Sequence, residues 1–323
     1  MTRSMFKVQS SMFKVQHSKF KVQSSAVKVR PASSADGVEL GTLNLEHGTW
    51  NSVNPRVARG FTLVEMVVVI AITGILAAAV AVFIRRPVEA YVDVARRGEL
   101  SDIADTALRR ITRDLRTALP NSIRIVTAGN VTYIEYLQTN GGGRYRAAPD
   151  SGGAGDTLDF ATADSTFDVI GSMPPLAAGD SIVIYNLSPT GSTANAYAGD
   201  NRGAYSSNTA SAITLSPAKK FPYESPGKRF QVVEGAVTYA CDPLPAGAGE
   251  LRRYWGYGIV DPQPTPPTGG SNALLATNIS GCGFNYAASS ATARTGVLAL
   301  TLQVTEGSET VRLFQQAHVN NVP

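Results

Sequence analysis

The sequence has few charged side chains and very few histidines, and both shortages limit what the chain can do. Charged residues make up 17% of its 323 residues, against about 25% in an average soluble domain. Intrinsic disorder requires low hydrophobicity and high net charge, so this composition argues against it. The three histidines are His17, His47 and His318, and the sequence contains no zinc-protease motif, nucleophile elbow or phosphate-binding loop. We therefore expect no enzymatic activity, no metal site and no cofactor.

Basic charge is scarce over most of the chain, although the formal net charge is +4. Residues 1–60 hold nine of the 29 Lys and Arg residues and three of the 25 Asp and Glu residues. The remainder therefore carries 20 basic and 22 acidic side chains. Because a nucleic-acid interface needs a basic patch, we expect no nucleic-acid partner for the folded part.

Cysteine is also scarce, since the chain has only Cys241 and Cys282. No CxxC or Cys/His spacing typical of a metal site accompanies them. Two buried free thiols and one disulfide are both compatible with the sequence. Export from the cytoplasm would favour the disulfide, which would stabilise the fold by about 4 kcal/mol through loop closure.

A seven-residue tandem repeat occupies residues 4–30, beginning SMFKVQS-SMFKVQH-SKFKVQS. Phe and Val lie two residues apart in each unit, which is a strand spacing and not a coiled-coil seam. Near-identical short units are typical of translated repetitive DNA. We expect residues 1–60 to be a leader that is spurious or cleaved, with translation starting near Val53 or Val57. Peptides from residues 4–30 in the expressed protein would contradict a spurious leader.

The most prominent feature that is present is an uncharged run over residues 66–84, ended by Arg85 and Arg86. As a helix it would span about 28 Å, close to the hydrocarbon core of a bilayer at about 30 Å. The run is too long and too uniformly apolar for a typical buried helix of a soluble protein. We predict that residues 61–86 form the membrane-spanning half of a long helix.

Helical periodicity continues past this run. From Leu100 to Leu119, apolar residues recur at three- and four-residue steps and form one stripe, and Pro120 ends the pattern. One helix over residues 61–119 would be about 88 Å long. We expect a kink at Pro87, because proline removes a backbone donor. Residues 87–119 should form an amphipathic half with one face covered by a folded domain.

Beyond residue 119 the apolar period changes to two, which predicts an antiparallel β-rich head over residues 120–323. The predicted fold class is therefore α+β, with one long helix packed on this head. The last two of the predicted strands, residues 296–305 and 309–319, are expected to form a hairpin that turns at residues 306–308. The predicted strands include residues 131–137, 181–187, 212–215, 230–239, 296–305 and 309–319.

Three other segments of the head have plain structural interpretations. Residues 141–143 (GGG) are predicted to be a flexible loop. Asp200 and Asn201 are predicted to form a turn, because a single acidic pair is weak evidence for a calcium site. Residues 252–257 (RRYWGY) are predicted to lie half in the core and half at a solvated edge. A carbohydrate or partner surface is the alternative for this last segment.

A carboxylate stands at the start of the apolar run. This carboxylate belongs to Glu65. An acidic residue inside a membrane segment costs about 3 kcal/mol of insertion free energy and is usually functional. The alternative is that Glu65 lies at the membrane edge and stays hydrated. An ordinary secretory signal, cut among residues 77–81, is another interpretation. However, Gly60 lies directly before the run and follows Arg56 and Arg59. Cleavage after Gly60 would leave the apolar run on the mature protein.

Residues 59–65 (RGFTLVE) and the apolar helix after them resemble the signal of type IV pilins and type II secretion pseudopilins. The resemblance implies that prepilin peptidase cuts after Gly60, that Phe61 becomes an N-methylated terminus, and that Glu65 is needed for assembly. It implies a single-pass inner-membrane subunit with a periplasmic head, which then enters a pilus fibre or its tip. Its expected partners are other pilins, inner-membrane lipid and the pilus assembly platform.

The same resemblance bears on the leader and on the cysteines. A leader of sixty residues is longer than the short basic leader of this family, whereas a start at Val53 would restore a short one. Export through this system favours a disulfide between Cys241 and Cys282.

Less distinctive stretches suggest a narrower relationship. Residues 111–120 are similar to the helix end of larger minor pilins related to pseudopilin J. Residues 251–258, 278–286 and 318–323 resemble a minor pilin of the mannose-sensitive haemagglutinin (MSHA) pilus system. This resemblance implies a subunit that primes or caps pilus assembly. The alternative is a pilus-mounted adhesin whose head binds a surface or a carbohydrate.

Overall fold

The structure, a computed structural model, describes residues 60–191, 193–287 and 295–323. The chain divides into two units, Met1–Thr62 and Leu63–Pro323, and all the helices and strands below belong to the second unit. The tandem repeat at residues 4–30, the alternative starts and nearly all of the predicted leader lie outside the described residues.

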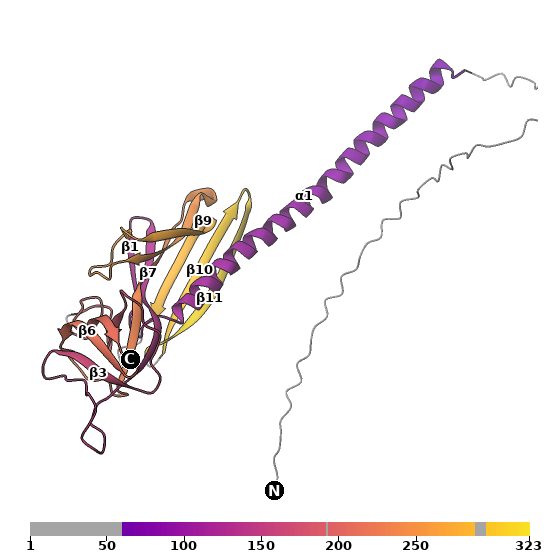
Figure 1. The fold of residues 1–323 in the computed structure, drawn as a ribbon. Coiled ribbons are helices and arrows are strands. Elements are labelled where there is room, and N and C mark those ends of the chain that lie inside the picture. The colour runs from indigo at the N-terminus through magenta and orange to yellow at the C-terminus, as the bar shows by residue number, and fades with distance from the viewer. Residues whose placement is uncertain (1–59, 192, 288–294) are drawn as a thin grey trace, which may run out of the picture. The chain divides into compact units, whose positions relative to one another are not determined.

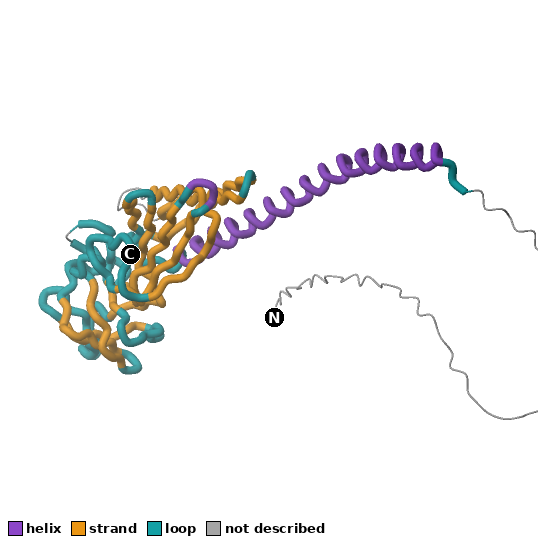
Figure 2. Tube along the Cα trace, turned by 90° about the horizontal axis from the view of Figure 1, so that it is seen from above, coloured by secondary structure: helices purple, strands orange, loops and turns teal. Residues whose placement is uncertain are grey.

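One long helix begins the second unit, as predicted. Helix α1 covers Leu63–Leu115 and contains Pro87 without being interrupted by it. Figure 2 shows the helix as curved rather than straight. The predicted end at Leu119 is wrong by four residues, because the chain turns after Leu115 and joins the sheet. The Leu119 N–H donates to the Leu137 carbonyl over 2.7 Å and so leaves the helical pattern.

Eleven antiparallel strands form the described part of the head (Figure 1). They are β1 (Arg124–Ala128), β2 (Val131–Tyr145), β3 (Asp164–Ile170), β4 (Ser181–Val183), β5 (Arg202–Asn208), β6 (Ala212–Lys219), β7 (Arg229–Asp242), β8 (Gly249–Tyr257), β9 (Ser271–Ala287), β10 (Thr295–Glu306) and β11 (Glu309–Asn320). A short 3₁₀ turn, η1 (Pro245–Gly247), precedes β8.

The strands are arranged in two parts that share β2 and β7. In the first part, the order β1-β2-β7-β8-β9-β10-β11 makes a continuous sheet. In the second part, β2 pairs with β3, β3 with β6, β6 with β5, β5 with β4, and β4 with β7. Because β7 also pairs with β2, these six strands close into a ring.

Each part has its own apolar core. The first core lies between α1 and the sheet, where Leu108 and Ile111 of the helix pack among Leu300, Leu302 and neighbouring residues. The helix face that is buried there is the stripe predicted from the sequence; it contains Leu100, Ala104, Ala107, Leu108, Ile111 and Leu115. The second core, which includes Phe167, Phe221 and Phe230, consists of residues of the ring and its loops.

The predicted hairpin near the C-terminus is confirmed. Strands β10 and β11 pair from Thr295↔Asn320 to Glu306↔Glu309, so Gly307 and Ser308 form the turn. Gly307 has a φ of +61°, a conformation that glycine adopts without steric cost.

The prediction of a loop at residues 141–143 is wrong. Gly141, Gly142 and Gly143 belong to β2 and pair with β7. The reason lies in packing: a Cβ at Gly143 would lie 2.8 Å from the Cζ of Phe230, so only glycine lets this buried ring approach the strand. Glycine in a strand often marks such a close approach.

Candidate functional site

The first half of α1 is exposed on all sides within the described chain. Its large apolar side chains include Ile70, Ile75 and Phe83, which are 64%, 70% and 82% exposed. Among the described residues, α1 is the one helix long and apolar enough to span a membrane, and none of its apolar window is buried. A continuous apolar surface of this kind requires a lipid or protein covering.

The three residues of the predicted processing signal lie at the start of this helix. Gly60 and Phe61 come before α1 and are exposed. Glu65 is the third residue of the helix and stands in its first turn, where the helix dipole favours a negative charge. Cleavage after Gly60, methylation of Phe61 and the assembly role of Glu65 stay predictions.

Farther along, α1 is attached to the head by an ion pair and then by apolar packing. Arg97 donates from Nη2 and Nε to one Glu309 oxygen of β11 over 2.7 and 3.1 Å. Leu100, three residues later, is the first fully buried residue of the helix. The exposed and buried halves therefore meet near residues 97–100, well beyond the end of the uncharged run.

A polar cluster fastens the end of the helix to the sheet. The Asp114 carboxylate accepts hydrogen bonds from Arg253 Nε over 3.1 Å, Tyr239 Oη over 2.7 Å and Arg110 Nε over 3.2 Å. Asp114 and Arg253 are mostly buried, with side-chain exposures of 13% and 15%. Burial raises the pKa of Tyr239, which keeps its hydroxyl protonated as the donor.

A second polar network is buried where the two parts of the head meet. Arg124 donates from Nε and Nη2 to Glu135 Oε1 over 2.9 and 2.6 Å, and its guanidinium lies 3.6 Å from the ring centroid of Tyr197. The other Glu135 oxygen accepts from Tyr257 and Thr238. Burial raises the pKa of Glu135, although the Arg124 charge opposes that shift.

The sequence-based interpretation missed both networks. The sequence did contain a signal for the network around Arg124 and Glu135. These two oppositely charged residues are direct partners in the β1–β2 hairpin around Gly129. Opposite charges placed symmetrically about a turn predict a cross-strand pair.

The two cysteines form a disulfide in the structure. Cys241 lies on β7 and is fully buried, and Cys282 lies on β9. The bond therefore links the two strands that flank β8 on either side. A Cα–Cα distance of 6.5 Å falls within the usual range for a disulfide.

The other segments considered in the sequence have structural roles. Both Asp200 oxygens accept backbone N–H groups, from Ala194 and Asn195, so Asp200 organises a turn. Residues 252–257 lie in β8, where Trp255 is half-buried beneath Arg253 at 5.1 Å and Tyr257 is buried. Within the described residues, no group of three or more His, Cys, Asp or Glu could hold a metal ion.

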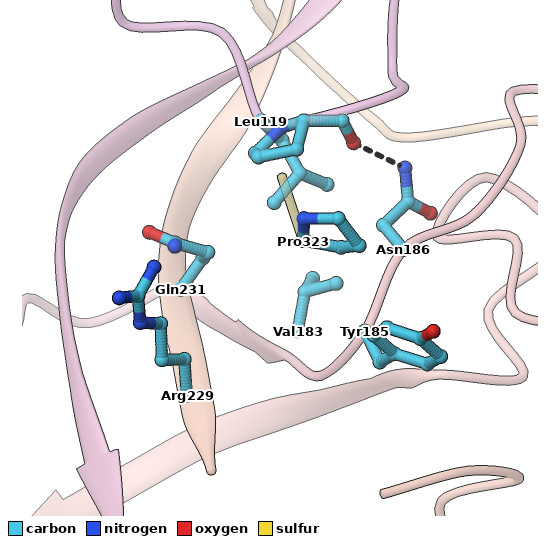
Figure 3. A pocket seen from close by; sticks show the side chains of 8 residues that line it. Leu119, Val183, Tyr185, Asn186, Arg229, Gln231 and Pro323 are labelled. Carbon is cyan, nitrogen blue, oxygen red and sulfur yellow. Dashed lines mark hydrogen bonds between the residues drawn. The ribbon is translucent and has the colours of Figure 1, made fainter. Parts of the chain in front are cut away.

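One small hollow lies near the end of the chain (Figure 3). There Pro323 sits between Leu119 and Val183, and Asn186 Nδ2 donates to the Pro120 carbonyl over 2.8 Å. Its volume of about 10 Å³ leaves room for about one water molecule. This hollow is therefore a packing detail and not a ligand site.

Comparison with known proteins addresses the N-terminal segment. Residues 55–81 match the family model described as the prokaryotic N-terminal methylation motif. No curated protein and no solved structure matches the chain significantly. The matched segment includes Gly60, Phe61 and Glu65 and most of the uncharged run. The match covers this segment alone; with the exposed apolar helix and the antiparallel head behind it, the chain has a pilin-like α+β fold that begins with a prepilin-type methylation motif.

Proposed function

We propose that the chain is a minor pilin of an MSHA-type pilus, most similar to the subunit MshO, which primes or caps pilus assembly. The methylation motif joined to a helix half that is exposed on all sides supports the role as a pilin subunit. The assignment to an MSHA-type pilus rests on the resemblance of residues 251–258, 278–286 and 318–323. Prepilin peptidase cuts after Gly60, and the head then faces the periplasm while residues 61–86 hold the chain in the inner membrane. Residues 87–119 connect this anchor to the head of residues 120–323.

Electrostatics supports a specific role for Glu65. Cleavage after Gly60 creates a positively charged amine on Phe61. In the apolar interior of a fibre, the carboxylate of Glu65 is tolerated only when it is paired with a positive charge. The Phe61 amine of a neighbouring subunit provides that charge and thereby sets the axial position of the two subunits.

The test is the number of pili, counted by electron microscopy, in a strain that lacks this chain. Deletion should strongly reduce the number, and the wild-type chain should restore it. The variant Glu65→Gln should be cleaved normally but should fail to restore pili. Glu89→Gln is the matched control, because Glu89 is an exposed residue of the same helix and forms an exposed ion pair with Arg85 one turn away. A full number of pili without the chain would contradict the priming function.

A second function, that of a pilus-mounted adhesin, is favoured by one observation. The head contains a hollow of about 450 Å³ beside Arg202 and Lys219, which is the size of a small-molecule site. For an adhesin, deletion should leave the number of pili unchanged and abolish attachment to a surface.

A further inference from the structure

A hollow of about 450 Å³ opens in the head at a fork between strands. On the side of β7 away from β2, residues 231–233 pair with β4, whereas β8 begins to pair at Ala236. Glu234 and Gly235 lie between these two pairings, and both line the hollow. A crevice remains at this fork because β4 and β8, which both pair with β7, separate from each other there.

Two cations from adjacent strands line this hollow. They are Arg202 of β5 and Lys219 of β6. Within the part of the chain that the structure describes, the Arg202 side chain has no hydrogen bond and no ion pair. Lys219 Nζ donates to the Gly199 carbonyl over 2.6 Å. The nearby Asp200 does not pair with either cation, since both its oxygens accept backbone N–H groups.

The burial of these charges is unfavourable without an anion. Burial lowers the pKa of Arg202. Burial also lowers the pKa of Lys219, and the charge of Arg202 adds to that effect while Asp200 opposes it. A partly buried cation without a counter-ion destabilises a fold. The geometry is therefore that of a site completed by an anionic group from outside.

The remaining walls add shape and hydrogen-bonding groups. A Cβ on Gly179 or Gly235 would meet no atom within 4 Å, so the absence of side chains there keeps the hollow open. Glu234 lines it as well, and its Oε2 accepts a hydrogen bond from Gln138 over 2.5 Å. Tyr257 and Ile259 supply apolar surface.

We propose that this hollow binds a sugar acid, meaning a hydroxylated ring that bears a single carboxylate. Arg202 and Lys219 hold the carboxylate, because a guanidinium matches its planar geometry. The hydroxyl groups donate to Glu234, and the ring lies beside Tyr257 and Ile259. The volume suits a ligand of this size.

The acidic residue in the site distinguishes this ligand from a plain anion. Glu234 repels the second negative charge of a phosphate dianion, but it accepts hydrogen bonds from neutral hydroxyl groups. A neutral sugar lacks the charge that Arg202 needs. This inference goes beyond the role in pilus assembly and does not depend on it, because binding is measured on the isolated chain.

The test is isothermal titration calorimetry on the full chain in non-ionic detergent micelles. The probes are galacturonate, glucose, sodium phosphate and glutamate. We expect saturable binding of galacturonate alone. Arg202→Gln should weaken it by about tenfold or more, because a charge-assisted hydrogen bond is lost. Lys219→Gln should also weaken it.

Arg144→Gln is the matched control, because it removes one positive charge from an exposed residue that lines a different hollow. It should leave galacturonate affinity within about twofold, as expected for a distant rim charge. The thermal midpoint of Arg202→Gln should equal or exceed that of the wild type, since an unpaired charge is removed. Any one of three results would overturn the proposal. They are the absence of saturable galacturonate binding, binding of phosphate or glutamate as tight as that of galacturonate, and a loss of galacturonate affinity in Arg144→Gln equal to that in Arg202→Gln.

Discussion

The Asp114 carboxylate at the end of α1 lies 3.1 Å from Arg253 Nε on β8, and both side chains are largely buried. This pair joins the last turn of the helix to the middle of the sheet across 139 residues of sequence. Within the described residues, the apolar window in the first half of α1 is not buried against the head. The helix is therefore fixed to the head at one end and left available for lipid or other subunits at the other.

Asp114→Asn should destabilise the head by about 2 kcal/mol or more, because it leaves Arg253 buried without its counter-charge. The free energy of unfolding is measured in urea by fluorescence of Trp255, which lies 5.1 Å from the Arg253 guanidinium. Asp105→Asn is the control, since Asp105 and its partner Arg109 are 48% and 74% exposed. Its loss should not exceed about 0.5 kcal/mol. Equal losses in both variants would show that the Asp114 pair has no special role.

Reduction of the Cys241–Cys282 disulfide should lower the free energy of unfolding by about 4 kcal/mol, because the unfolded chain gains freedom when the loop opens. Thermal unfolding with and without reductant measures the change. The double variant Cys241→Ala/Cys282→Ala should melt at the same temperature in both conditions. An unchanged melt of the fully reduced protein would contradict the stabilising role of the disulfide, and alkylation of the unreduced protein from the periplasm would show that the disulfide is not present.

Stability should fall at alkaline pH because of buried tyrosines. Burial raises the pKa of Tyr145 to about 12 and also raises the pKa values of Tyr136, Tyr197, Tyr239 and Tyr257. Each contributes stability that is fully present below the unfolded pKa of about 10 and is lost as the pH rises above it. Absorbance at 295 nm should show these groups ionising only together with the loss of circular dichroism. Complete ionisation of a chain that remains folded would contradict the prediction, and the chain in urea provides the reference titration.

The sequence predicted those parts of the fold that have a regular apolar period. The uncharged run and the stripe from Leu100 predict α1, and alternation predicts the β10–β11 hairpin. The run of three glycines in β2 misled the prediction, because glycine has no side chain to show a period. Its role depends on Phe230, which is distant in sequence. The ring of strands was missed for a related reason, since it depends on the pairing of β7 with both β2 and β4.

Of the two candidate sites, one could be predicted from the sequence and the other could not. Gly60, Phe61 and Glu65 form a local motif and could be recognised from consecutive residues. Arg202 and Lys219 meet only because β5 and β6 are neighbours in the folded ring. No local pattern around either residue indicates a shared site.

The most direct test of the account is the identity of the first residue of the protein purified from membranes or pili. Mass spectrometry of the N-terminal peptide should find N-methylated Phe61, followed by the intact apolar helix. A chain that begins within residues 77–84, or an uncut precursor at steady state, would contradict the claim that this helix survives cleavage and carries the subunit into a fibre.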